Sequence, residues 1–83
     1  MTDVALPMEA WQDVEPGTEA LLDEWLVQEG ERVAAGQVLA KVVLVKATLD
    51  VAAPAAGIVD RILVAADATF KPGQALARLR GEG

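Results

Sequence analysis

The fold is decided by a run of strand-forming residues with one lysine near its middle, Val42-Val43-Leu44-Val45-Lys46-Ala47-Thr48-Leu49-Asp50-Val51. Val, Leu and Thr are typical of a pleated strand, whereas a lysine is costly to bury inside one. We therefore predict that the chain turns at this lysine and places it at the tip of a β-hairpin. No Gly, Asn or Pro marks the turn, so local turn chemistry alone does not predict it.

The composition limits the class of protein. The 83 residues are 53% hydrophobic but include only two Trp and one Phe, which predicts one small domain with a mainly aliphatic core. The absence of cysteine excludes disulfides and thiolate metal sites. The absence of histidine removes the commonest general base and metal ligand, and no nucleophile–base pair is visible, so we do not expect an enzyme.

Charge and hydropathy argue against two kinds of partner. The net charge of −6 is unfavourable for binding nucleic acid or an anionic membrane surface. No apolar run approaches the roughly 20 residues of a membrane span. The first residues, Met1-Thr2-Asp3-Val4, carry no basic region and no apolar signal segment, so we expect a cytoplasmic protein.

Short apolar runs separated by turn signals continue on both sides of the hairpin. The expected strands are residues 4–7, 21–27, 38–45, 49–52, 58–64 and 75–79, with a further apolar return from Val33. Such spacing is typical of an all-β sandwich or barrel. The local alternative is a helix over residues 19–28, whose Ala, Leu, Glu and Trp are good helix formers. Gly30, Gly36, Gly57 and Gly73 fit turn positions with a positive φ.

An internal repeat favours the strand interpretation. Residues 33–42 recur as residues 70–79, at an offset of 37, with four of ten positions identical. The same offset places Trp25-Leu26-Val27 on Ile62-Leu63-Val64, which have the character of a strand. Two copies, about 4–40 and 41–80, suggest halves related by a pseudo-two-fold axis. Reuse of Pro-Gly and Ala-Gly turns is the chance alternative. The axis would place the Lys46 hairpin at one end and both termini at the other.

The chain resembles a lipoyl domain of the biotinyl/lipoyl carrier family over nearly its whole length. The segments that carry the resemblance are Glu24-Trp25-Leu26-Val27, Glu29-Gly30-Glu31, Val33, Gly36-Gln37-Val38-Leu39-Ala40, Lys46-Ala47-Thr48, Pro54, Ala56-Gly57-Ile58-Val59 and Pro72-Gly73-Gln74-Ala75-Leu76-Ala77. Each segment alone is weak evidence for the resemblance, whereas their order and spacing together are strong evidence for it. The resemblance implies one carrier domain over residues 1–83, an all-β flattened barrel-sandwich hybrid of two four-stranded antiparallel sheets. It also implies lipoate attached to Lys46 by an amide bond.

The resemblance implies a carrier rather than a catalyst. Such a swinging arm shuttles acyl groups and reducing equivalents in a 2-oxo acid or acetoin-type dehydrogenase complex, as a free-standing domain or as part of an acyltransferase component. Its implied partners are lipoate ligase or lipoyl transferase, the dehydrogenase (decarboxylase) component and dihydrolipoyl dehydrogenase, with the domain itself monomeric. The alternatives are an unmodified adaptor or structural domain and, further behind, a biotin carrier.

The residues beside the lysine depart from the family pattern. Most lipoyl domains of acyltransferases have Glu, Thr or Ser, and Asp before the lysine, where this chain has Val43, Leu44 and Val45. The Val-Lys-Ala tripeptide resembles the glycine cleavage H protein, another lipoyl carrier, which is longer. Biotin domains have Met on both sides of the lysine, whereas this chain has Val45 before Lys46 and Ala47 after it.

Several residues are candidates for partner recognition. Val43 and Val45 should face away from Val42 and Leu44 and form an apolar patch near the tip, beside Ala47. A surface valine in a strand is also ordinary.

The 8–18 loop lies near the lipoyl hairpin in the family, so Trp11, Asp13 and Glu15 could replace the missing acidic residues. For Trp11 the alternative is a core position, and we expect Trp25 in the core. For Lys46 the alternative is an edge lysine that discourages aggregation. Lys41 and Lys71 are poorer attachment candidates.

Overall fold

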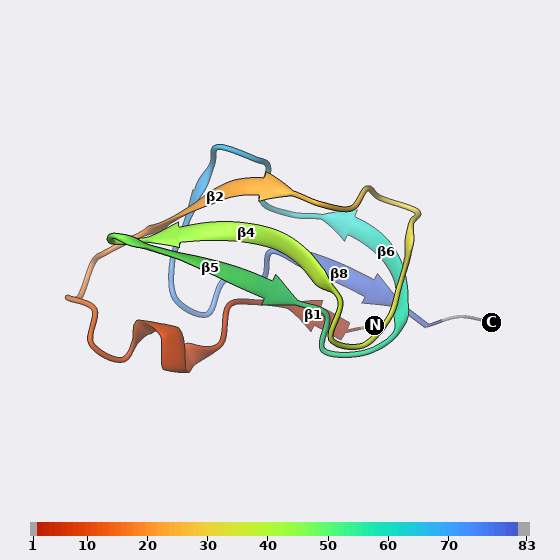
Figure 1. Ribbon diagram of the computed structural model, residues 1–83, viewed down its shortest axis with the longest axis horizontal. Helices are drawn as coiled ribbons and strands as arrows, with labels where there is room; N and C mark the ends of the chain where they lie inside the picture. Colours follow the sequence, from red (N-terminus) through yellow and green to blue (C-terminus); the bar gives the residue numbers. More distant parts are fainter. Residues whose placement is uncertain (1, 82–83) are drawn as a thin grey trace.

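The protein is a flattened sandwich of two antiparallel sheets in the computed structural model, which describes residues 2–81 (Figure 1). One sheet has the order β1 (Thr2–Val4), β8 (Ala77–Arg80), β6 (Gly57–Ile62) and β3 (Arg32–Val33). The other has the order β5 (Ala47–Ala52), β4 (Val38–Leu44), β2 (Ala20–Trp25) and β7 (Thr69–Phe70). The extents of 41 × 21 × 16 Å show the flattening. The predicted all-β fold of two four-stranded sheets is confirmed.

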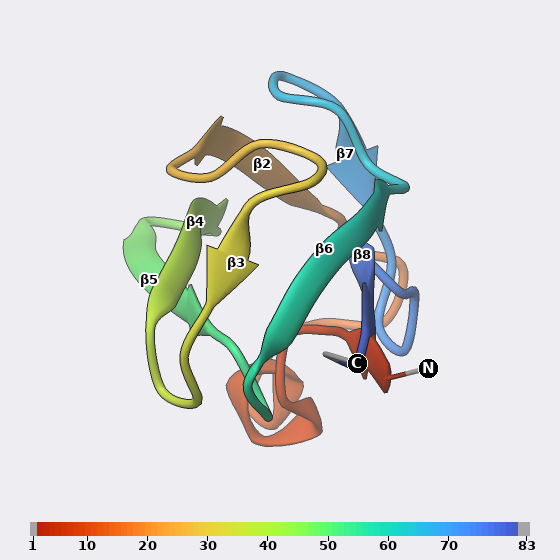
Figure 2. The ribbon, with the colours of Figure 1, turned by 90° about the vertical axis from the view of Figure 1, so that its right-hand side faces the viewer.

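Figure 2 shows the strands of the two sheets around the interior of the sandwich, and alternating side chains from both sheets build the core there. In β4, Val42 and Leu44 are buried while Val43 between them is only partly covered, the period-2 pattern of a strand with one face in the core. The largest fully buried side chain is Phe70, surrounded by aliphatic residues such as Leu22 and Leu76. Each such side chain contributes about 1.5–3 kcal/mol by leaving water.

The helix considered for residues 19–28 does not form. Residues Ala20–Trp25 are strand β2, which pairs with β4 on one side and β7 on the other. Ala20 and Leu22 point into the core, and the charged Asp23 and Glu24 lie outside. Burial between two partner strands outweighs the helix propensity of these residues, which is a weak preference of under about 1 kcal/mol per residue.

Several boundaries differ from the sequence-based prediction. The first strand lies at Thr2–Val4 rather than 4–7, because Pro7 lacks an N–H and leads instead into a short 3-10 helix, η1 (Met8–Trp11). The two-residue strand β7 (Thr69–Phe70) was not expected, and such short pairings give no period-2 pattern in sequence. Residues 1, 82 and 83 lie outside the described part of the chain.

The 37-residue offset recurs in the three-dimensional structure. Strands β2 and β6 span residues 20–25 and 57–62, and β3 and β7 span 32–33 and 69–70, so both pairs are offset by 37. The hydrogen bonds repeat as well: the N–H of Leu26 donates to the carbonyl of Leu39, and that of Leu63 to Leu76, both at 2.8 Å. Equivalent strands occupy equivalent places in the two sheets, as a pseudo-two-fold axis requires.

The hairpin tip and the chain ends lie at opposite ends of the long axis. The β4–β5 connection is at one extreme in Figure 1, while the N-terminal end of β1 and the C-terminal end of β8 lie together near the other. The register agrees, since Thr2 pairs with Leu79. The structure therefore holds the lysine hairpin far from the points where the chain enters and leaves the sandwich.

Gly57 corrects one expectation about the glycines. Gly30, Gly36 and Gly73 have the predicted positive φ, between 81° and 89°. Gly57 lies in β6 outside that region, and it is needed for a different reason. A Cβ there would lie 2.5 Å from the carbonyl oxygen of Arg80, which is backbone and cannot move aside easily. The glycine permits a close approach of β6 and β8.

We expect Gly57→Ala to lower the free energy of unfolding by about 1–3 kcal/mol, because the added methyl group forces β6 and β8 apart. Urea denaturation of the variant measures this loss. Gly81→Ala is the matched control, since nothing lies within 4 Å of a Cβ there, and we expect it to stay within about 0.5 kcal/mol of the wild type. Equal stability of the two variants would contradict the close approach.

Candidate functional site

Lys46 lies at the tip of a two-residue hairpin loop. Strand β4 ends at Leu44 and β5 begins at Ala47, and these two residues pair across the hairpin. Val45 and Lys46 form the turn between them, and both are exposed. No hydrogen bond or ion pair within residues 2–81 involves Lys46. The predicted hairpin is confirmed, and it presents an amine without a partner in the described structure.

The turn forces an unusual conformation on Val45. Its φ is 60°, and Asp67 is the only other described non-glycine residue with a positive φ. A positive φ at the first central residue but not at the second is the pattern of a type II′ turn, where glycine is preferred. A β-branched residue in this region is an outlier. Backbone strain is common at functional sites. Because a strained valine takes the place of the preferred glycine, the residues of the turn did not predict it.

We expect Val45→Gly to raise the free energy of unfolding by about 1 kcal/mol, because it relieves the strain of the positive φ. Little packing is lost, since the Val45 side chain is 66% exposed. Thermal unfolding followed by circular dichroism measures the change. Val43→Gly is the control: its backbone is an ordinary strand, so glycine there should destabilise by about 0.5–1 kcal/mol. A destabilised Val45→Gly variant would contradict the strained turn.

The other two lysines have different surroundings. Lys41 is only partly exposed within β4, where the register places it opposite Glu24 on β2 and Asp50 on β5. Opposite charges across a pair of strands stabilise a sheet, so Lys41 has a structural role. Lys71 follows β7 and precedes the turn at Pro72-Gly73, so it is not part of the hairpin. Lys46 alone among the three combines exposure with a place at the tip.

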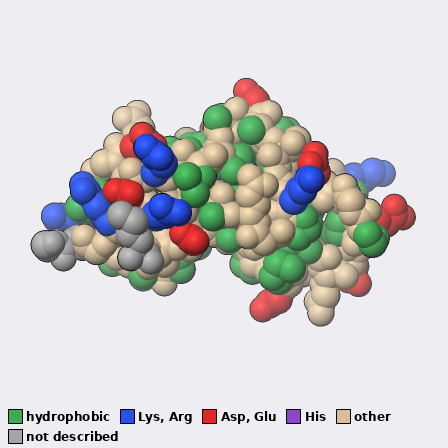
Figure 3. Space-filling model, turned by 180° about the vertical axis from the view of Figure 1, so that it is seen from behind, with side chains coloured by type: hydrophobic (Ala, Val, Ile, Leu, Met, Phe, Trp, Pro, Cys, Tyr) green, Lys and Arg blue, Asp and Glu red, His purple; other side chains and the backbone are tan. Residues whose placement is uncertain are grey.

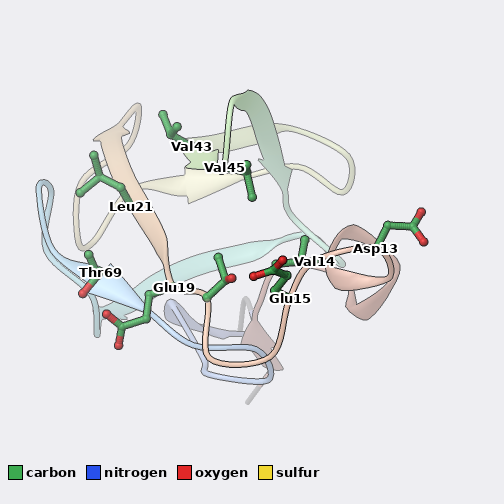
Figure 4. A pocket seen from close by; sticks show the side chains of 9 residues that line it. Asp13, Val14, Glu15, Glu19, Leu21, Val43, Val45 and Thr69 are labelled. Carbon is green, nitrogen blue, oxygen red and sulfur yellow. The ribbon is translucent and has the colours of Figure 1, made fainter.

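A groove of about 500 Å³ lies beside the tip, and we call it the tip groove. One wall comes from the hairpin and the other from the 8–18 loop and its continuation into β2, as Figure 4 shows. Its lining combines apolar side chains with three carboxylates and two hydroxyls: Val14, Leu21, Val43, Val45, Asp13, Glu15, Glu19, Thr18 and Thr69. The groove therefore has the valines of the hairpin on one side and acidic groups on the other.

The structure brings four of the recognition candidates together. Val43 and Val45 line the tip groove from the hairpin, and Asp13 and Glu15 line it from the loop. Ala47 lines a second groove of about 530 Å³ on the other side of the hairpin, together with Lys46 and Asp13. Glu19 was missed, because it lies outside the loop that the resemblance singled out. Its signal was its place just before β2, a strand that begins beside the hairpin, where Leu21 pairs with Val43.

Trp11 is a core residue, which corrects its place among the recognition candidates. Its side chain is 7% exposed and packs edge to face against Phe70, with ring centroids 6.0 Å apart. The core alternative for Trp11 is the one observed. Trp11 therefore anchors the 8–18 loop to the sandwich.

Trp25, expected in the core, is only partly buried and donates its indole Nε1–H to the carbonyl of Val64 at 2.8 Å.

Residues 2–81 contain no group of three or more His, Cys, Asp or Glu side chains placed to hold a metal ion. In the same part of the chain, no helix has the length and hydropathy needed to cross a membrane.

Comparisons with known proteins identify the family and the fold. The family model described as "Biotin-requiring enzyme", the biotin/lipoyl attachment family, matches residues 3–79. The fold is similar to that of the lipoyl domain of the 2-oxoglutarate dehydrogenase complex from Azotobacter vinelandii, with a TM-score of 0.79, 22% identity and complete coverage of both chains. A search of curated proteins with this sequence gave no significant match. A family model that covers nearly the whole chain shows that this protein belongs to the biotin/lipoyl attachment family.

Proposed function

We propose that this chain is a lipoyl carrier domain, with lipoate attached by an amide bond to Lys46. The observation that carries the proposal is the position of Lys46. It is an exposed amine without a partner in residues 2–81, at the tip of a two-residue loop, at the opposite end of the sandwich from both chain ends. A carrier needs an accessible attachment point on a rigid support, and a β-hairpin packed into a sheet supplies it.

The cofactor supplies the redox and acyl-carrying dithiolane that a chain without cysteine lacks. The contribution of the protein is to hold the attachment point and to move it between partners. Because the chain ends lie far from the tip, a tether there leaves Lys46 free to enter a partner's active site. Tethering raises the local concentration of the arm to the millimolar range without tight binding. Residues 1–83 act as one carrier domain, with no active site of their own.

We place the domain in a 2-oxo acid or acetoin-type dehydrogenase complex, where it shuttles acyl groups and reducing equivalents. Lipoate ligase or lipoyl transferase loads it, the decarboxylase component acylates it and dihydrolipoyl dehydrogenase reoxidises it. The support is the likeness to a lipoyl domain of a 2-oxoglutarate dehydrogenase complex, together with the acidic tip groove. Asp13, Glu15 and Glu19 reach the neighbourhood of the lysine through space rather than from the positions before it.

The substitution of the usual acidic residues before the lysine has a structural consequence. Leu44 is buried, so it belongs to the core rather than to any recognition surface. Val43 and Val45 face the tip groove instead. We propose that partners contact the apolar side of the groove, formed by these two valines, and meet negative charge from the 8–18 loop opposite. A partner surface with an apolar centre and basic edges fits this arrangement.

Lipoate is favoured over biotin by the residues beside the lysine, since Val45 and Ala47 replace the methionines of biotin domains. The test is the intact mass of the purified domain after incubation with lipoate and lipoate ligase, and separately with biotin and biotin ligase. We expect a lipoyl-sized gain in the first reaction and none in the second. A biotin-sized gain alone would assign the protein to the biotin branch. No gain in either reaction, from a folded domain, would favour the unmodified adaptor.

A further inference from the structure

The four arginines of the chain all lie on one sheet. Arg32 is in β3, Arg61 in β6, and Arg78 and Arg80 in β8, and all four are exposed. The strands of the other sheet contain none. In Figure 3 most of the basic side chains lie toward the end of the molecule where the chain termini lie, with acidic side chains among them. We call the outer surface of the sheet β1–β8–β6–β3 the arginine face.

The strand register explains why the arginines share this face. Arg61 pairs with Arg78 across β6 and β8, and Ile58 pairs with Arg80. Residues directly opposite one another point to the same side of a sheet. The alternate residues, Val59 and Leu79, are buried in the core, so the arginines point outward.

The positive charge of the face is only partly neutralised by the domain itself. The Arg78 Nε lies 3.4 Å from Asp3 Oδ1, and both side chains are well exposed, so this ion pair is weak. No hydrogen bond or ion pair within residues 2–81 involves the side chain of Arg61 or Arg80. Like charges directly opposite one another, as at Arg61 and Arg78, destabilise a sheet. Arg61 and Arg78 thus face each other at a cost to the fold, on a sheet whose strands also carry the acidic residues Asp3 and Asp60.

We propose that the arginine face binds an acidic, extended segment of a partner protein. Guanidinium groups form paired hydrogen bonds with carboxylates, which makes Asp and Glu side chains the matching groups. Ile58 is partly exposed between Arg80 on β8 and Arg32 on β3, and it offers apolar contact to the segment. Duplex DNA carries about twice as much negative charge per unit length as an extended acidic peptide, so the net charge of −6 repels nucleic acid more strongly. This binding does not depend on loading of Lys46, which lies at the other end of the sandwich.

The test is a titration of the ¹⁵N-labelled domain with an acetylated deca-glutamate peptide, followed by NMR at low ionic strength. We expect shifts in the amides of β3, β6 and β8 and not at the hairpin tip. The double variant Arg61→Gln/Arg80→Gln should weaken binding by about tenfold. The control Lys41→Gln/Lys71→Gln removes the same charge elsewhere, and we expect it to change the affinity by less than about twofold.

A third variant separates binding from stability. Arg61→Glu puts a carboxylate opposite Arg78, so it should raise the thermal unfolding midpoint while it weakens peptide binding. A variant that merely damaged the fold would lower both. Four results would overturn the proposal: equal weakening in the two double variants, shifts centred on the tip, tighter binding of a thymidine oligonucleotide than of the peptide, or shifts that change on dilution of the free domain, which would identify a second copy as the occupant.

Discussion

Lys46→Arg is expected to abolish loading of the domain by lipoate ligase, with no detectable mass gain where the wild type is fully modified. The guanidinium of arginine keeps its positive charge and does not form the amide, so the substitution retains charge and length but removes the reacting amine. The turn itself should be undisturbed, because the side chain at this position is exposed and makes no contact that the fold needs. Intact mass spectrometry after the ligase reaction measures the effect.

Lys41→Arg and Lys71→Arg are the matched controls for this prediction. Lys41 lies within β4 between Glu24 and Asp50, and Lys71 precedes a Pro-Gly turn, so neither is presented at a hairpin tip. Both variants should be loaded as the wild type is. The double variant Lys46→Ala/Ala47→Lys moves the amine by one residue. It should reduce the rate of the ligase reaction by at least about 100-fold, because a displacement of only about 1 Å can have that effect. Full loading of Lys46→Arg would place the attachment elsewhere.

Phe70→Ala is expected to cost about 3–5 kcal/mol of unfolding free energy, the largest effect on stability among single substitutions in this domain. The ring is 1% exposed and is the largest fully buried side chain in the described structure. Small domains have a total stability of about 5–15 kcal/mol, so this loss leaves the fold marginal. Urea denaturation followed by tryptophan fluorescence measures it. Met8→Ala, at a side chain that is 62% exposed, should stay within about 0.5 kcal/mol of the wild type.

The same substitution tests how the 8–18 loop is held. Trp11 packs edge to face against Phe70, and its indole N–H has no hydrogen-bond partner among the described residues, so apolar packing is what holds the ring. Removing Phe70 should therefore loosen the loop that carries Asp13 and Glu15 into the tip groove. Phe70→Leu retains most of the apolar volume, and we expect it to restore much of the stability. Equal stabilities for Phe70→Ala and Met8→Ala would contradict the central place of this ring in the core.

The hairpin could be predicted from the run of residues around Lys46, and the two four-stranded sheets from the resemblance to lipoyl domains. The run of strand-forming residues from Val42 to Val51 indicates strands, and a lysine inside such a run indicates a turn. The 37-residue repeat carries topological information that single strands lack, and it predicted that the tip and the termini lie at opposite ends.

Features that depend on contacts between distant segments could not be predicted in the same way. Gly57 is required by the backbone of Arg80, 23 positions away, rather than by its own φ. The burial of Trp11 depends on Phe70 from the other half of the repeat. The tip groove likewise forms only when the 8–18 loop packs beside the hairpin.

The measurement that tests the central claim most directly is tandem mass spectrometry of the peptides of the wild-type domain, after production with lipoate and its ligase. The predicted result is a lipoyl-sized increase on the peptide that contains Lys46, with the fragment ions placing it on that residue. An unmodified Lys46 in a domain shown to be folded, or the same increase on Lys41 or Lys71, would contradict the assignment of Lys46 as the attachment point of a lipoyl carrier.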